Sequence, residues 1–152
     1  MNKIFIFLAL TFLGLNNIKA HTFVSKASGG WSTASTWTIT VVTGTATNTT
    51  PGNLDNVIIN PGHSVSLSAN ASSFKSLVIS ATATLATASK QIWAYGNMTN
   101  NGTITGNPII TFRQNSTFSS STPYTNTGDW YIREGNLTIA SGVTVSRNSS
   151  MW

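Results

Sequence analysis

The sequence predicts an all-β fold, a segment of a right-handed parallel β-helix in which short strands stack as the coils of a solenoid. Three observations lead to this prediction. The 152 residues are rich in Ser, Thr and Asn and only 7% are charged, which is typical of β-rich extracellular proteins. After residue 20 no stretch has the apolar periodicity of an amphipathic helix. Short apolar segments, separated by turn residues, recur about every 18 residues.

Residues 1–20 have the pattern of a secretory signal peptide. Lys3 supplies the positive start, Ile4 to Leu15 form the apolar run, and Ala20 precedes the expected cut, so the mature chain would begin at His21. An apolar run of this length spans about 18 Å as a helix, whereas the hydrocarbon core of a membrane is about 30 Å thick. We therefore expect a secreted bacterial protein located at the cell surface, with no membrane span after the leader is removed.

Residues 21–152 are expected to form a single solenoid domain. A chain of this size can bury about two-thirds of its unfolded surface in one core. Cysteine is absent, so stability must come from hydrogen-bond ladders and packed apolar rows rather than from disulfides. The sequence stops at Met151–Trp152 within the repeating pattern, which predicts that the domain is truncated at its C-terminus.

The expected strands are short and are bounded by Gly, Pro, Asn and Asp residues. They are Val57–Ile59, Val65–Leu67, Leu77–Ile79, Thr84–Leu85, Ile92–Tyr95, Thr103–Thr105, Ile109–Phe112, Trp130–Ile132, Leu137–Ile139 and Val143–Val145. Their centres form two interleaved rows, which predict two parallel sheets: Ile58, Val78, Ala94, Ile110 and Tyr131 in one, and Leu67, Leu85, Ile104, Phe118 and Leu137 in the other. An antiparallel β-sandwich is the alternative, because it has the same frequency of turns.

Four segments occur in a fixed order along the chain, and they are Trp31–Trp37, Pro51–Ile59, Pro61–Leu67 and Gly96–Ile104. This order resembles the N-terminal region of large secreted bacterial surface proteins that are exported by type IX secretion. It is also similar to the eight-glycine domain of extracellular proteins. The resemblance implies a non-catalytic, adhesin-like scaffold, with a C-terminal region, missing from this chain, that would engage the secretion machinery.

Five residues are expected to have structural roles. Trp31 and Trp37 would cap the open end of the solenoid. Asp55 precedes a buried strand, where its carboxylate can accept backbone N–H bonds of the turn. Gly62 and His63 belong to a Pro-Gly-His turn.

Few residues could support catalysis, and we expect no enzyme, no cofactor and no metal. Asp129 and Glu134 flank one strand and could form a glycosidase pair only if their carboxyl groups were about 5 to 10 Å apart. We favour a turn-capping role for Asp129 and a solvated Glu134. An N-terminal His21 with His63 as its partner could hold copper, as in lytic polysaccharide monooxygenases. Nothing else in the chain resembles that family.

Binding functions remain as alternatives to a bare scaffold. Trp93 and Tyr95 are two residues apart in one strand, so their side chains lie on the same face. If that face is outward, it would bind polysaccharides or cell-surface glycans, and the chain would be a carbohydrate-binding or carbohydrate-processing module. An ice-binding solenoid is suggested by three threonine runs, Thr36–Thr40, Thr43–Thr49 and Thr82–Thr84. The net charge of +5 falls to +3 when Lys3 and Lys19 are removed with the leader, and this charge is too thinly spread for nucleic acid.

Overall fold

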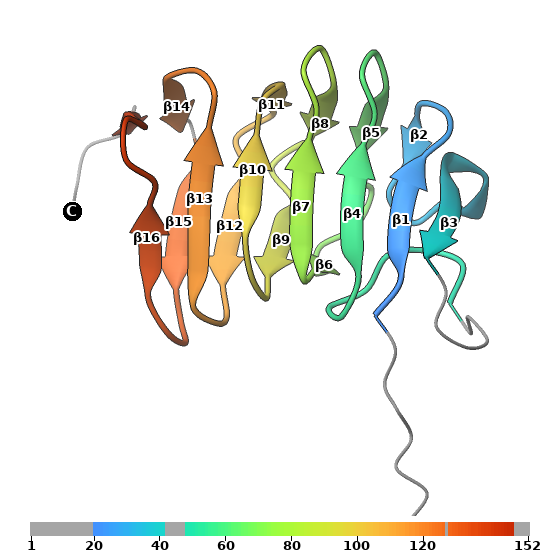
Figure 1. Ribbon diagram of the computed structural model, residues 1–152, viewed down its shortest axis with the longest axis horizontal. Coiled ribbons are helices and arrows are strands. Elements are labelled where there is room, and N and C mark those ends of the chain that lie inside the picture. Colours follow the sequence, from blue (N-terminus) through green and yellow to red (C-terminus); the bar gives the residue numbers. More distant parts are fainter. Residues whose placement is uncertain (1–19, 42–47, 127, 148–152) are drawn as a thin grey trace, which may run out of the picture.

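The computed structural model describes residues 20–41, 48–126 and 128–147, and it is a parallel β-solenoid of about four turns (Figure 1). The predicted all-β solenoid is confirmed. The alternative of an antiparallel sandwich is wrong, because among the strand pairs of the described residues only β1 (Thr22–Ser25) with β3 (Trp37–Val41) is antiparallel. One short 3-10 helix, η1 (Ala34–Thr36), precedes β3.

Sheet A is seven-stranded and runs the length of the solenoid, as the row of arrows from blue to red in Figure 1 shows. Its order is β3, β1, β4 (Asn56–Ile59), β7 (Ser76–Ile79), β10 (Met98–Asn100), β13 (Ser116–Ser120) and β16 (Leu137–Ile139). Partners in adjacent strands, such as Val57, Leu77 and Met98, are about 20 residues apart, which is the length of one coil.

The other two faces of each coil belong to shorter sheets. Sheet B has the order β2 (Gly29–Gly30), β5 (Ser64–Ser66), β8 (Thr84–Ala86) and β11 (Thr103–Thr105). Sheet C has the order β6 (Ser72–Phe74), β9 (Gln91–Ala94), β12 (Ile109–Phe112) and β15 (Asp129–Ile132). After β13 and β16 the chain forms a separate two-stranded sheet from β14 (Tyr124–Asn126) and β17 (Val145–Arg147).

The prediction of two sheets is wrong, because a complete coil has three strands. The first predicted row joins Ile58 and Val78 of sheet A to residues of sheet C, and the second joins Leu85 of sheet B to Phe118 of sheet A. Every face of the solenoid repeats once per coil. A predicted row of strand centres can therefore pass from one sheet to another with little change in the spacing between its members. The expected strands also omit β1, β2, β3, β6, β10, β13 and β14, and the expected Val143–Val145 overlaps the observed β17 only at Val145.

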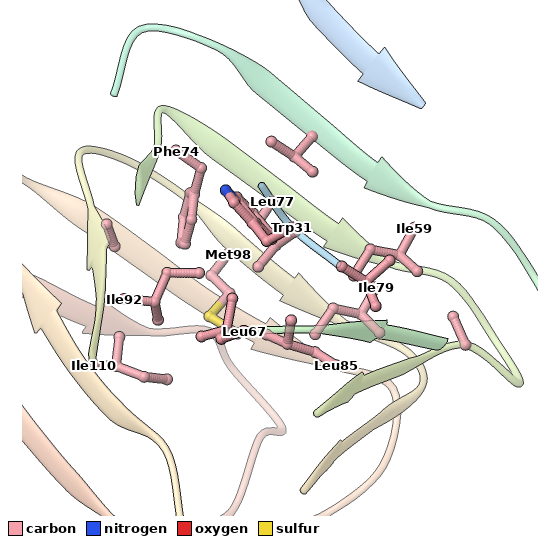
Figure 2. Close-up of a cluster of buried hydrophobic side chains, with 14 of the residues drawn as sticks. Trp31, Ile59, Leu67, Phe74, Leu77, Ile79, Leu85, Ile92, Met98 and Ile110 are labelled. Carbon is pink, nitrogen blue, oxygen red and sulfur yellow. The ribbon is translucent and has the colours of Figure 1, made fainter. Parts of the chain in front are cut away.

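The core is a column of apolar side chains enclosed by the three sheets. In each strand alternate residues point inward, so single apolar residues from successive coils stack on one another. Figure 2 shows part of this column: Trp31, Ile59, Leu67, Phe74, Leu77, Ile79, Leu85, Ile92, Met98 and Ile110, all at most 2% exposed. Burial of each such side chain contributes about 1.5 to 3 kcal/mol, so the column is the main stabilising feature of the fold.

The corner between β4 and β5 is a tight turn that is bonded to the preceding coil. The backbone N–H of His63 donates to the carbonyl of Asn60 (3.1 Å), with Pro61 second and Gly62 third in the turn. Gly62 has φ +76°, the value that a type II turn requires at this position. The Nδ1 atom of His63 is 2.9 Å from the hydroxyl of Ser25, which also accepts the N–H of Asn60 at 2.8 Å.

Aromatic residues close the N-terminal end of the core. Trp31 and Trp37 are both buried, their ring centroids are 5.5 Å apart, and Nε1 of Trp37 donates to the carbonyl of Trp31 at 2.8 Å. Phe23 of β1 packs edge-on against Trp37. β3 pairs antiparallel with β1 and is therefore the edge strand of sheet A at this end. It occupies the position where a strand of another parallel coil could otherwise pair with β1.

Candidate functional site

The outer face of sheet C has the most distinctive group of exposed side chains. In β9 the inward residues are Ile92 and Ala94, both fully buried, so Trp93 must point outward. In the strands on either side of it, Trp93 pairs with Ser73 and with Thr111, and Thr111 pairs in turn with Tyr131. Strand pairing therefore places Trp93 and Tyr131 in one row, two strand spacings or about 10 Å apart.

A second row lies beside the first, just beyond the ends of the strands. Backbone bonds continue the ladder there, with Tyr95 N–H donating to Phe74 (2.9 Å), Arg113 N–H to Ala94 (2.8 Å) and Arg133 N–H to Phe112 (2.9 Å). Side by side across the coils, this row therefore contains Lys75, Tyr95, Arg113 and Arg133. We name Trp93, Tyr95, Arg113 and Tyr131 the aromatic face.

Arg113 connects the two rows. Its guanidinium carbon is 4.9 Å from the centroid of the Trp93 ring, within the range of a cation–π contact. Its Nη2 atom is 3.4 Å from Oε1 of Glu134, whose side chain is 65% exposed. An ion pair with so exposed a partner adds little stability, so the main effect of these contacts is to fix the positions of Arg113 and the indole.

Thr111 lies beneath the aromatic face. It points outward in β12 but is only 1% exposed, and its hydroxyl oxygen accepts a bond from Nε2 of Gln91 at 2.9 Å. Tyr131, next to it in the row, is 47% exposed. The face therefore has a shielded polar centre between two aromatic residues, with cationic side chains along one side.

The candidate catalytic residues are not brought together. Asp129 begins β15 and the ladder continues to Arg133, so the extended backbone places these two residues about 13 Å apart, with Glu134 one residue further. His21 precedes β1 and His63 bonds Ser25 at its end, about 13 Å away along the strand. In the part of the chain that the structure describes, no group of three His, Cys, Asp or Glu residues could hold a metal ion.

The threonine runs have different surroundings. Thr36 is buried, Thr82 lies in a turn with φ +63°, and Thr43–Thr49 falls largely outside the described residues. Hydroxyl side chains do align on the outer face of sheet B, where Ser64, Thr84 and Thr103 are paired. Among the strands of that sheet, only β11 has Thr at both outward positions.

Sequence reasoning selected Trp93 and Tyr95 but not Arg113, Thr111 or Tyr131. The signal that could have found them is the coil length of about 20 residues, which places Trp93, Thr111 and Tyr131 at equivalent positions of successive coils. Comparison of the chain with protein-family profiles, curated proteins and solved structures gave no match. No helix of the described segments is long and apolar enough to cross a membrane.

Proposed function

We propose that this chain is a non-catalytic scaffold, an adhesin-like segment of a secreted protein at the bacterial cell surface. The observation that supports the proposal is the continuous core within parallel ladders, which makes a rigid rod out of a chain with few charges and no disulfides. Asp129 and Glu134 lie at opposite ends of β15, and His21 and His63 lie at opposite ends of β1, and these positions favour a role without catalysis.

Two measurements test the scaffold role, one on source cells that express the protein from its own gene and one on the purified chain. Antibody labelling of intact cells is expected to detect it at the surface. The purified chain is expected to release no new reducing ends from any polysaccharide that it binds. A purely intracellular location, or turnover that Asp129→Asn or Glu134→Gln abolishes, would contradict the proposal.

A second function, carbohydrate binding, is favoured by the outward position of Trp93. We propose that the scaffold presents the aromatic face to polysaccharide, with sugar rings packing on the exposed surfaces of Trp93 and Tyr131. Aromatic rings combine apolar area with low conformational entropy, which suits them to this contact. The basic row of Lys75, Arg113 and Arg133 would add charge-assisted bonds to carboxylate or sulfate groups, so we expect acidic polysaccharides to bind more tightly than neutral ones.

The binding test is depletion of the purified chain from solution by a panel of insoluble neutral and acidic polysaccharides. Trp93→Ala is expected to abolish depletion. Val78→Ala is the matched control, because Val78 is also a half-buried outward residue but belongs to sheet A. Equal depletion of wild type and Trp93→Ala, or no depletion by any member of the panel, would overturn the carbohydrate proposal and leave the scaffold alone.

A further inference from the structure

The carboxylate of Asp55 is buried next to the start of β1, where it accepts three hydrogen bonds. Its Oδ1 atom accepts the backbone N–H of His21 at 2.9 Å. Its Oδ2 atom accepts the backbone N–H of Gly52 and the side-chain amide of Asn48, both at 2.8 Å. Asp55 is 3% exposed and His21 is 4% exposed, so this group is shielded from water.

The three donors are neutral, and no cation of the described segments balances the carboxylate. Within residues 20–41, 48–126 and 128–147 no Lys, Arg or His side chain lies within 4.0 Å of the Asp55 carboxylate oxygens. A buried carboxylate is costly unless it is both hydrogen-bonded and paired with a positive charge. Asp55 has the bonds, but among the described residues it has no partner of opposite charge.

Hydrolysis of the peptide bond before His21 would supply that charge at the right atom. The bond between the carbonyl carbon of Ala20 and the nitrogen of His21 breaks, and water adds hydroxyl to the carbon and a proton to the nitrogen. At neutral pH the new carboxylic acid passes its proton to the amine, which leaves an Ala20 carboxylate and a His21 α-ammonium. The ammonium nitrogen is the same atom that is 2.9 Å from Oδ1 of Asp55.

The His21 ring supports the same conclusion. Its Nδ1 atom is buried and has no hydrogen-bond partner in the described part of the chain. An α-ammonium has three N–H donors where the amide has one, so cleavage would place additional donors beside this acceptor. A buried polar atom without a partner is costly, and the processed chain can remove that cost.

We propose that the Ala20–His21 bond is a proteolytic processing site and that Asp55 is the binding site of the α-ammonium group that processing creates. The pair would join strands of three coils, because Asn56 N–H donates to the His21 carbonyl and Lys75 N–H to the Asp55 carbonyl, both at 2.8 Å. Removal of the leader thus stabilises the N-terminal end of the solenoid. This inference rests on the export part of the proposed function and is independent of carbohydrate binding.

The test compares the unfolding of three forms of the processed chain: one with a free amine at His21, one with an acetylated His21, and one that retains Ala20. Acetylation keeps the N–H donor and removes only the charge. The free amine is expected to lower the unfolding equilibrium constant by about tenfold relative to both other forms. In Asp55→Asn the difference is expected to vanish or reverse, and equal stability of all three forms in the Asp55 background would overturn the inference.

A second measurement does not depend on the stability of the Asp55 variant. The rate at which an amine-specific reagent modifies the His21 amine, followed on the N-terminal peptide by mass spectrometry, is expected to be at least about tenfold lower in the native than in the urea-unfolded chain. Equal rates would contradict a bound ammonium. N-terminal sequencing of exported protein tests the cleavage separately, and a start other than His21 would overturn the processing site.

Discussion

The guanidinium of Arg113 lies over the ring of Trp93, 4.9 Å from its centroid; Trp93 belongs to β9, and Arg113 directly follows the adjacent strand β12 of sheet C. The contact fixes the indole in one orientation and places a permanent positive charge beside it. An aromatic surface and a cation are therefore combined on one face of the rod, which is the basis of the proposed preference for acidic polysaccharide.

Replacing Arg113 by Gln tests this combination. Arg113→Gln is expected to weaken binding of an acidic polysaccharide by about tenfold and binding of a neutral one by less, because hydrogen bonds to charged groups are the stronger kind. Added salt should reduce the difference. Titrations of wild type and Arg113→Gln with both polysaccharides measure this difference in affinity. Lys26→Gln, at an exposed lysine next to β1, is the control for the loss of one charge. An equal loss for both polysaccharides would contradict the charge preference.

The interior column is expected to be sensitive to truncation. Phe74 of β6 is fully buried, whereas the neighbouring Ser73 points outward. Phe74→Ala should reduce the free energy of unfolding by about 3 to 5 kcal/mol, because it leaves a cavity between coils. Ser73→Ala should change it by less than about 0.5 kcal/mol. Urea denaturation measures both, and similar effects of the two substitutions would contradict the assigned strand orientation.

One surface turn is expected to be improved by glycine. Ala88 and Ser89 have φ values of +48° and +58°, and Lys90 N–H closes their turn on the Thr87 carbonyl at 2.8 Å. Positive φ is costly for a residue with a side chain, so Ser89→Gly should raise the free energy of unfolding by about 0.5 to 1 kcal/mol. Ser68→Gly, at an exposed position without positive φ, should not raise the free energy of unfolding. Thermal denaturation measures both variants, and a Ser68→Gly variant more stable than Ser89→Gly would contradict the positive φ of Ser89.

Tyr124 is expected to make stability fall at high pH. Burial raises the pKa of Tyr124 to about 12 from an ordinary value of 10.0. Between these pH values the unfolded chain loses a proton that the folded chain keeps, so the free energy of unfolding decreases as pH rises, in total by about 2 kcal/mol. The urea midpoint of wild type should fall relative to that of Tyr124→Phe as pH rises through this range. A constant difference would show that the tyrosine is not protected.

The class of fold was predictable because composition and turn spacing reflect the coil directly. The number of faces was not, because a strand of a solenoid needs only one large inward residue. In β6 that residue is Phe74, with two serines beside it, and the ladder bonds rather than an apolar run define the strand. β2 is two glycines and has no side-chain pattern at all. Such strands can be predicted from the sequence only when the coil length is known.

The candidate site was predictable in part for the same reason. Two residues of one strand, Trp93 and Tyr95, could be placed on a common face by alternation alone. Arg113 and Tyr131 are about 20 and 40 residues further along the chain, and only the pairing of β9, β12 and β15 brings them beside Trp93. The hydrogen bond between His21 and Asp55 likewise depends on the pairing of strands, since it joins residues 34 positions apart.

The central claim, that the solenoid is a scaffold with one carbohydrate-binding outer face, is tested most directly by mapping a soluble acidic oligosaccharide onto the isotopically labelled chain by NMR. The account predicts that amide shifts change in Gln91–Tyr95, Ile109–Arg113 and Asp129–Arg133, and that the outer faces of sheets A and B do not respond. Shifts confined to those other faces, or no saturable change with any oligosaccharide that the depletion panel selects, would contradict it.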